Sequence, residues 1–346
     1  MPVRTEVRRF INFMNKVRAI IEPATAAAQW ERATEKDLYY CCRLLLGRKP
    51  SQFELQAYTP QLKSGSLSLE TLTRIFIDAS EFLARQEQRA AAQYNPVLLE
   101  LENFKIYVSP ENSLVGKSIL EKRHYEAHVT AMIQQILKPG MTFVDVGANI
   151  GYLSLVAAHA VGERGKVICF EPDQYNCSLL HMSVEVNGWH HVEIYPFAVS
   201  NKNTVLVYDS TYGSGTTSDF EADFKPSPSH RLVRALILDE VLQGEDKVHL
   251  LKLDIDGAEG RALQGARGII RQYRPVILSE FCPQLLQDIS KISGQDYLQA
   301  IIKENYTLSI VAFDGALIEC GTDASQVIRY LEESRLIYVD MVAFPN

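Results

Sequence analysis

The chain has 346 residues, of which 47% are hydrophobic and 22% are charged, as is usual for globular proteins. Its length suits two domains, and its net charge of −7 argues against general nucleic-acid binding, which needs a concentrated basic surface. The six cysteines form no C-x-x-C pair, so neither a zinc site nor a disulfide framework is indicated, and we expect a cytoplasmic protein. No uncharged apolar stretch approaches about 18 residues, so we expect no transmembrane segment.

The first 92 residues are predicted to form a small helical domain. Apolar residues from Phe10 to Ile21 recur at spacings of three and four among basic residues, which indicates an amphipathic helix. Such a helix either contacts a membrane surface or partner, or docks on its own protein. Apolar stripes predict three further helices between about 34 and 88, and Ser51 with Glu54 forms a capping box at the start of the second.

A different pattern begins after a boundary near the sequence AAAQYNP, and it continues through residues 97–346. Short apolar, β-rich runs alternate there with helical segments, which predicts a mostly parallel sheet with helices on both faces. Residues 211–230 are rich in Gly, Ser and Pro, and we predict a long loop. The predicted strands are Thr142–Val146, Lys166–Phe170, Val192–Phe197, Leu250–Asp254, Val276–Phe281, Thr307–Phe313 and Ile337–Phe344.

The first motif is FVDVGANIG, in which a predicted strand ends near Asp145 and a helix follows Gly151. In open α/β sheets ligands bind beyond the carboxyl ends of the strands, and Gly147 lets the backbone approach such a ligand closely. A dinucleotide site would show G-x-G-x-x-G, whereas this D-x-G-x-x-x-G pattern places a carboxylate beside the turn. A carboxylate favours the cationic end of S-adenosylmethionine, and Asn149 adds a side chain that forms hydrogen bonds. The alternative is a tight strand–helix turn with a capping Asp.

The second motif follows the next predicted strand as Glu171-Pro172-Asp173. A carboxylate at the end of the second strand is placed to accept hydrogen bonds from both hydroxyls of a ribose. Pro172 fixes the turn that carries Glu171. The third strand leads into Ala198-Val199, a small apolar segment suited to lie against an adenine ring.

The third motif is LLKLDIDGAEGRAL, with Asp254 at the carboxyl end of a predicted buried strand. Asp254 and Asp256 point to one side of an extended strand, and Glu280 ends the next strand at the same edge. A carboxylate that ends a buried strand needs partners, which favours a site for Asp254. Glu259 is equally well explained by a favourable charge in a first helical turn.

The motifs VDVGANIG, CFEPD, PFAVSN, LKLDIDGAE and RPVILSEF, in this order, resemble the FkbM family of methyltransferases from about residue 104 to 346. The resemblance implies a class I methyltransferase fold, Rossmann-like, with a seven-stranded sheet whose last strand is antiparallel. It also implies methyl transfer to a hydroxyl, often of a sugar or natural product. The family generally has Glu where this chain has Asp256. Residues near 38–83 resemble a small bacterial helical domain of unknown function, which implies no chemistry.

Carried over from the family, Asp145, Gly147, Asn149 and Gly151 would hold the methionyl part of S-adenosylmethionine. Glu171 would hold the ribose, while Asp173, Ala198 and Val199 would flank the adenine. Transfer to an alcohol requires removal of its proton, and a well-placed carboxylate can accept it. We therefore predict Asp254 as the base or acceptor-orienting group, helped by Asp256, Glu259 or Glu280.

Three alternatives remain open from the sequence. One is an NAD(P)-dependent oxidoreductase on a similar sheet, which the missing G-x-G-x-x-G disfavours. Another is a catalytically inactive nucleoside-binding or tethering module, which the carboxylates at successive strand ends disfavour. A shared Mg²⁺ at Asp254 is the third, and we expect no metal because two acids on one strand rarely complete an octahedron. The expected partner is a small-molecule or saccharide acceptor.

Overall fold

The structure, a computed structural model, describes residues 33–45, 49–68, 71–72, 75–76, 96–109, 114–211, 214–219 and 230–346. The chain divides into two compact units, Met1–Asn95 and Pro96–Asn346. Each unit is described by itself below. The helix expected at 10–21 and most of the last helix expected before residue 88 lie outside the described residues.

Two helices are described in the first unit, α2 (Glu35–Leu45) and α3 (Gln52–Ser64). The capping box predicted from the sequence is confirmed. The backbone N–H of Ser51 donates to Glu54 Oε2 at 2.7 Å, and the backbone N–H of Glu54 donates to Ser51 Oγ at 3.2 Å. The helices share a small apolar core formed by residues that include Leu38, Cys42, Leu62, Leu72 and Phe76.

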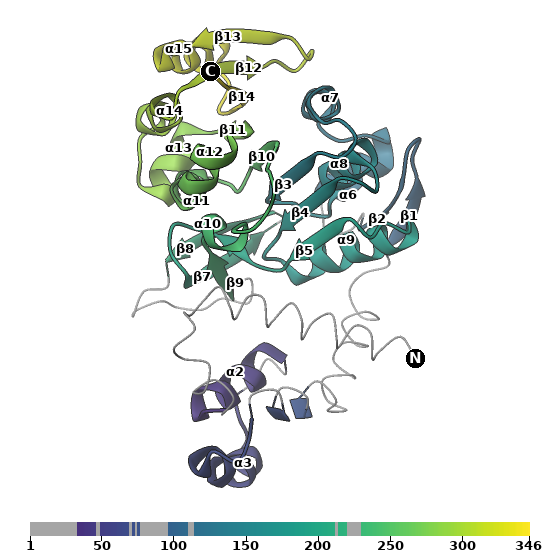
Figure 1. The fold of residues 1–346 in the computed structure, drawn as a ribbon, viewed down its shortest axis with the longest axis vertical. Helices are drawn as coiled ribbons and strands as arrows, with labels where there is room; N and C mark the ends of the chain where they lie inside the picture. Colours follow the sequence, from purple (N-terminus) through teal and green to yellow (C-terminus); the bar gives the residue numbers. More distant parts are fainter. Residues whose placement is uncertain are drawn as a thin grey trace. The chain divides into compact units, whose positions relative to one another are not determined.

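The second unit contains an eight-stranded sheet in the order β13-β12-β14-β11-β10-β3-β4-β5 (Figure 1). The central strands from β5 to β11 are parallel, and the last strand in the chain, β14, runs antiparallel between β11 and β12. The strands are β3 (Thr142–Val146), β4 (Lys166–Phe170), β5 (Val192–Tyr195), β10 (Leu250–Leu253), β11 (Val276–Phe281), β12 (Tyr306–Val311), β13 (Leu317–Gly321) and β14 (Val339–Pro345).

The predicted count of seven strands is wrong, because β13 adds an eighth at the edge beyond β12. Leu317, Ile318 and Glu319 are exposed, so β13 lacks the buried apolar run by which the other strands were recognised. Strands β3 and β10 are neighbours in the sheet, although β4 and β5 come between them in the sequence. From β3 the sheet therefore grows first toward β5 and then, from β10, in the opposite direction. The point between β3 and β10 is a topological switch point, where ligands bind in open α/β sheets.

Helices follow the strands and pack against them. Helix α8 (Tyr152–Val161) packs on β3 and β4, and nearly all of its residues are buried. Helix α9 (Gln174–Val186) packs on β5 and on the hairpin strand β2. The other described elements of this unit outside the second sheet are β1 (Val97–Glu100), β2 (Lys105–Val108), α6 (Leu114–Lys122), α7 (Ala127–Ile136), α10 (Leu238–Val241), α11 (Glu259–Gly265), α12 (Arg267–Tyr273), α13 (Pro283–Leu285), the π-helix η2 (Leu286–Ser290), α14 (Gly294–Lys303) and α15 (Ala324–Ser334).

A second sheet, in the order β6-β9-β7-β8, corrects part of the loop predicted at 211–230, because Ser214–Asp219 form a strand; residues 212–213 and 220–229 lie outside the described residues. Its strands are β6 (Ala198–Val199), β7 (Thr204–Thr211), β8 (Ser214–Asp219) and β9 (His230–Leu236). Strand β8 pairs antiparallel with β7, which satisfies its backbone although its sequence, SGTTSD, is polar. A Cβ at Gly215 would lie 2.3 Å from the ring of Tyr208, so only glycine allows this close approach.

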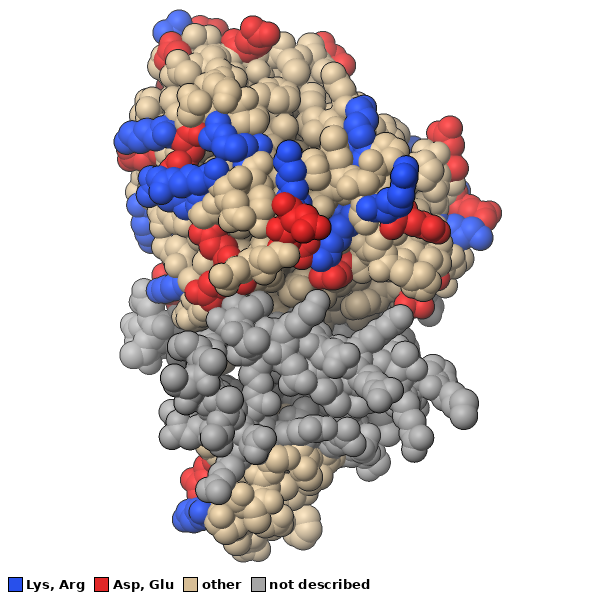
Figure 2. Space-filling model, viewed as in Figure 1, with Lys and Arg blue, Asp and Glu red and all other residues tan. Residues whose placement is uncertain are grey.

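All six cysteine side chains are buried, two in the first unit and four in the second. Basic and acidic side chains are interspersed over the face of the second unit that Figure 2 shows. Arg267 and Arg271, for example, both pair with Glu304 at 2.8 Å. Within the described ranges, no helix combines the length and the apolar character needed to cross a membrane.

Candidate functional site

A cavity of about 250 Å³ lies at the carboxyl ends of β3, β4, β10 and β11, at the switch point of the large sheet. The second sheet contributes to its wall through Tyr208, Gly215 and Thr217, and the segment between α6 and α7 contributes Tyr125 and Glu126. The sequence-predicted residues that line the cavity are Gly147, Asn149, Glu171, Pro172, Ala198, Val199, Asp254, Asp256 and Glu280.

The turn after β3 brings the backbone close to the end of β10. Gly147 has a φ of +87°, and a Cβ at this position would lie 1.9 Å from the backbone oxygen of Asp254. The N–H of Gly147 donates to the carbonyl of Phe170 at 2.9 Å, which ties the turn to β4. Asn149 also has a positive φ, of 51°, and its Oδ1 accepts from the backbone N–H of Ile150 at 2.8 Å. The turn is therefore closely held on two sides.

Glu171 lies at one end of the cavity, and protein donors surround its carboxylate. Its Oε2 accepts from the backbone N–H of Asn149 at 2.8 Å, and its Oε1 accepts from the backbone N–H of Asp173 at 2.8 Å. The Asn176 side chain is a further donor, at 3.4 Å. Burial raises the pKa of Glu171 to about 7. We call Asn149, Glu171 and Asn176 the nucleoside end of the cavity, after the ligand that the sequence leads us to expect there.

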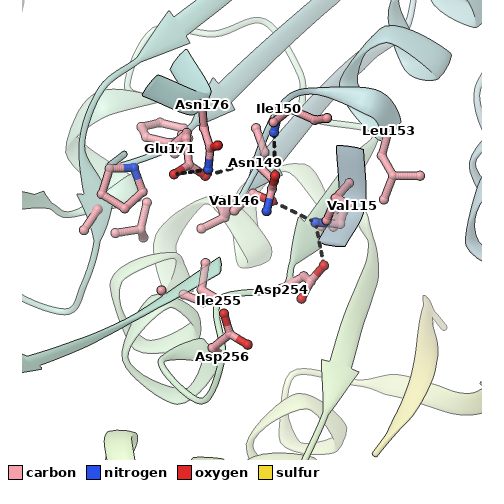
Figure 3. Close-up of a pocket in the computed structure, with 18 of the residues that line it drawn as sticks. Val115, Val146, Asn149, Ile150, Leu153, Glu171, Asn176, Asp254, Ile255 and Asp256 are labelled. Atoms are coloured by element: carbon pink, nitrogen blue, oxygen red, sulfur yellow. Dashed lines mark hydrogen bonds and ion pairs between the residues drawn. The ribbon is translucent and has the colours of Figure 1, made fainter. Parts of the chain in front are cut away.

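The opposite end carries four interacting carboxylates, Glu126, Asp254, Asp256 and Glu280, which we call the acceptor end, after the methyl acceptor that the sequence leads us to expect there. Figure 3 shows Asp254 and Asp256 across the cavity from Glu171 and Asn176, with Asn149 between them. Burial, followed by the charge of Asp254, raises the pKa of Asp256 to about 6. Burial and the same charge also raise the pKa values of Glu280 and Glu126.

Backbone strain accompanies this crowding of charge. Glu126 and Asp256 both adopt a positive φ, of 40° and 51°. For residues other than glycine this conformation costs energy and is common at functional sites. Among the described residues, no group of three or more His, Cys, Asp or Glu side chains could hold a metal ion.

Four predicted site residues do not line the cavity, and Asp145 is the most informative of them. Its carboxylate is completely buried behind the cavity wall, where Ser154 Oγ donates to it at 2.6 Å. Lys252 Nζ lies 3.2 Å from Asp145 Oδ1, because the two residues are direct neighbours in the register of β3 and β10. We predicted that Asp145 touches the ligand, but the structure makes it a partner of Lys252.

The other three such residues also have structural partners. A Cβ at Gly151 would lie 2.1 Å from Leu180, so this glycine allows α8 to pack on α9. Asp173 caps α9 by accepting from the backbone N–H groups of Tyr175 and Asn176, and it pairs with Arg231 at 2.7 Å. Glu259 accepts from the backbone N–H groups of Ile255 and Gly257, which closes the turn after Asp254. For Glu259, at the start of α11, this agrees with the alternative of a structural role in a first helical turn.

Several lining residues were not singled out from the sequence. Lys252 and Glu126 line the cavity, but neither is among the site residues predicted from the sequence. Tyr208 and Thr217 come from the hairpin of β7 and β8, which was not predicted, although Thr217 lies in the Gly- and Ser-rich segment that was predicted as a long loop. Asn176 follows Glu171 by five residues on α9, and its helical position could have indicated it.

The sequence was compared with known proteins. The FkbM methyltransferase domain matches residues 145–333. A probable cobalt-precorrin-6B C(15)-methyltransferase (decarboxylating) of Sulfolobus acidocaldarius is 29% identical over 139 residues, which are 38% of this chain and 70% of that protein.

Solved structures were compared as well. The methyltransferase FkbM of Methylobacillus flagellatus has a TM-score of 0.37 at 14% identity, and the match covers 62% of this chain and half of that chain. A precorrin-6y C5,15-methyltransferase of Geobacter metallireducens has a TM-score of 0.37 at 8% identity, covering 69% of this chain and 94% of that one.

The domain match extends over more than half of the 346 residues, and it contains every strand end that forms the cavity from Asp145 to Glu280. The large mixed sheet with its helices is that of a Rossmann-like class I methyltransferase. The chain belongs to the FkbM methyltransferase family.

Proposed function

We propose that this protein transfers a methyl group from S-adenosylmethionine to a hydroxyl of a sugar, glycan or natural product. The observation that carries the proposal is a single cavity with two chemically different ends. Its nucleoside end holds a preorganised carboxylate, and its acceptor end gathers carboxylates that can take up a proton. A transferase needs one end for each substrate, held in fixed relative positions.

The residues present fit the cofactor. The turn at Gly147 has no room for a Cβ, so backbone lines the cavity there, and Asn149 is beside it. These two residues would hold the amino-acid part. Glu171 would accept hydrogen bonds from the ribose, and Ala198 with Val199 would contact the adenine. When bound, the cofactor supplies an electrophilic methyl group on a sulfonium.

The chain's own contribution at the acceptor end is to orient a hydroxyl and to accept its proton. Asp254 is suited to this because its side chain is 32% exposed toward the cavity and Lys252 holds its Oδ2 at 3.0 Å. The pKa of Glu280, raised to about 9, favours its protonated form, which can donate a hydrogen bond to another oxygen of the acceptor, whereas Asp256, with a pKa raised to about 6, is mainly an acceptor at pH 7. A polyhydroxylated acceptor would satisfy both kinds of group.

We further propose that the chain consists of a helical domain, residues 1–92, followed by the methyltransferase domain at 97–346. Its buried thiols suit the reducing cytoplasm, where we expect it to act.

Isothermal titration calorimetry of the purified chain with S-adenosylmethionine, S-adenosylhomocysteine and NADH tests the cofactor. We expect both sulfur nucleosides to bind and NADH not to bind. Tight binding of NADH without either sulfur nucleoside would overturn the proposal in favour of an oxidoreductase.

A panel of monosaccharides, oligosaccharides and polyols, assayed with a radiolabelled methyl group, tests the acceptor. With an accepted substrate, Asp254→Asn should lower kcat by about 100-fold or more, because it removes the proton acceptor. The affinity for S-adenosylhomocysteine should change by no more than about threefold. Asp246→Asn, at the opposite edge of the sheet, is the matched control and should keep the full rate. A full rate in Asp254→Asn would refute this role for Asp254.

A further inference from the structure

A buried lysine joins the Gly147 turn to the acceptor end of the cavity. Lys252 is 3% exposed and lies in β10, two residues before Asp254. Its ammonium lies 3.2 Å from Asp145 Oδ1 and 3.0 Å from Asp254 Oδ2, and it donates to the carbonyl of Gly147 at 3.3 Å. The contacts with the two carboxylates are ion pairs, the contact with Gly147 is a hydrogen bond, and Asp145 Oδ1 has no hydrogen-bond partner among the described residues.

The contacts of Lys252 connect two neighbouring strands that lie far apart in the sequence. Asp145 and Gly147 belong to β3 and its turn, whereas Asp254 ends β10. The same turn has no room for a Cβ against the backbone of Asp254. Lys252 therefore holds the Gly147 turn, which we expect to contact the cofactor, at a fixed distance from the Asp254 carboxylate, which we expect to contact the acceptor.

The lysine also sets the charge of this region. Two carboxylates and one ammonium leave a net charge of −1, provided that all three groups are ionised. Burial by itself lowers the pKa of Lys252, but the charges of Asp145, Asp254 and Glu126 raise it above its usual value, so the ammonium keeps its proton. Without this lysine, Asp145, buried behind the cavity wall, and Asp254, at the cavity, would both lose a compensating positive charge.

We propose that Lys252 is a positioning residue that holds Asp254 against the Gly147 turn and limits the negative charge at the sulfonium position. The inference rests on the proposed function, since it assumes that a sulfonium occupies the cavity beside Asp254. A net charge of −1 favours the cationic cofactor over its neutral thioether product. The balancing ammonium keeps that preference moderate.

The test compares two ligands that differ by one methyl and one positive charge. The dissociation constants of S-adenosylmethionine and S-adenosylhomocysteine are measured by calorimetry at pH 8 for wild type, Lys252→Met and Lys252→Arg. Lys252→Met should raise the preference for S-adenosylmethionine by about tenfold or more, because one unit charge is removed within several Å of the sulfonium. Lys252→Arg should restore a preference close to that of the wild type.

Lys166→Met is the matched control. Lys166 also pairs with two carboxylates, Glu245 at 2.6 Å and Glu193 at 3.3 Å, but it begins β4 at the opposite edge of the sheet. It should leave the preference unchanged. If Lys252→Met weakens both ligands by the same factor, or changes neither, the lysine is merely structural and the inference is wrong.

Asp254→Asn decides the question even if Lys252→Met does not fold. It brings the net charge of the trio to zero, so the preference for S-adenosylmethionine should fall by about tenfold. An unchanged preference in this variant would also overturn the inference. A wild-type protein that binds neither ligand would instead refute the proposed function, so the two failures can be told apart.

Discussion

The two ends of the cavity differ in how their carboxylates are satisfied. At the nucleoside end, Glu171 accepts two backbone N–H groups and an amide donor. At the acceptor end, no hydrogen bond from the described residues reaches the carboxylates of Asp256 and Glu280, which instead repel Asp254. The protein thus satisfies the carboxylate of the nucleoside end itself, whereas Asp256 and Glu280 at the acceptor end lack donors that a bound molecule can bring.

This difference separates two sources of specificity. A preorganised carboxylate selects its ligand by geometry, because its remaining lone pairs point in fixed directions. A group of carboxylates with raised pKa values selects by hydrogen-bond donors and by proton uptake. The nucleoside end should therefore be sensitive to backbone changes, and the acceptor end to pH.

The largest effect is expected from Gly147→Ala, which distorts the boundary between the two ends. The new Cβ would lie 1.9 Å from the backbone oxygen of Asp254, so one of the two strand ends must move. We expect binding of S-adenosylhomocysteine to be lost, together with a clear drop in the melting temperature measured by differential scanning calorimetry.

Gly140→Ala provides the matched control for this substitution. Gly140 has the same φ of +87°, but nothing lies within 4 Å of a Cβ at its position. It should therefore show only the cost of the left-handed conformation, about 1–2 kcal/mol. If both variants behave alike, the close approach at Gly147 is not what shapes the cavity.

A smaller effect, confined to the nucleoside end, is expected from pH. Burial raises the pKa of Glu171 to about 7, and the ionised form is the better acceptor for ribose hydroxyls. Affinity for S-adenosylhomocysteine should be constant above about pH 8 and fall by up to about tenfold for each pH unit below 7. Calorimetric titrations between pH 5.5 and 8.5 measure this fall.

Glu171→Gln removes the titrating group, so its weaker binding should not change over the same range of pH. A wild-type affinity that rises on acidification would contradict the role of Glu171 as an acceptor of ribose hydroxyls.

The smallest effect is a change in stability at the acceptor end. Burial, with repulsion from Asp254, raises the folded-state pKa of Glu280 above its unfolded value, so the stability contributed by the protonated form is lost as pH rises through the folded-state pKa. Glu280→Gln should therefore raise the melting temperature at pH 9 and have little effect at pH 5.

Glu304 gives the opposite sign and serves as the control. Hydrogen bonds from Arg271 lower its pKa, so its ionised form stabilises the fold above the unfolded pKa. Glu304→Gln should lower the melting temperature at pH 9. Equal shifts for the two variants would mean that the Glu280 carboxylate is not under electrostatic strain.

Much of the large sheet could be predicted from the sequence. The bounds of β3, β4 and β11 were predicted to the residue, because each is an apolar run that ends at a polar or turn residue. Strands β8 and β13 were missed for the opposite reason. Their side chains are polar or exposed, and pairing with a neighbouring strand, which the sequence does not display, holds them in place.

The sequence predicts which strand ends form the site, but it does not predict the direction in which each side chain points. Glu171 and Asp254 directly follow apolar strands and line the cavity, whereas Asp145 lies inside β3, one residue before its end, and does not. The position of Asp145 depends on the register that puts it beside Lys252. Register is a property of the assembled sheet, so a lysine in one motif and an aspartate in another could not be matched beforehand.

The distribution of the buried thiols gives the protein internal reporters of its own opening. Cys41 and Cys42 lie in the first unit, whereas Cys169, Cys177, Cys282 and Cys320 lie in the second. A thiol-modifying reagent reaches such groups only when the surrounding structure opens. Pulse labelling in rising denaturant, read by peptide mass spectrometry, would therefore show which unit unfolds first without any engineered probe.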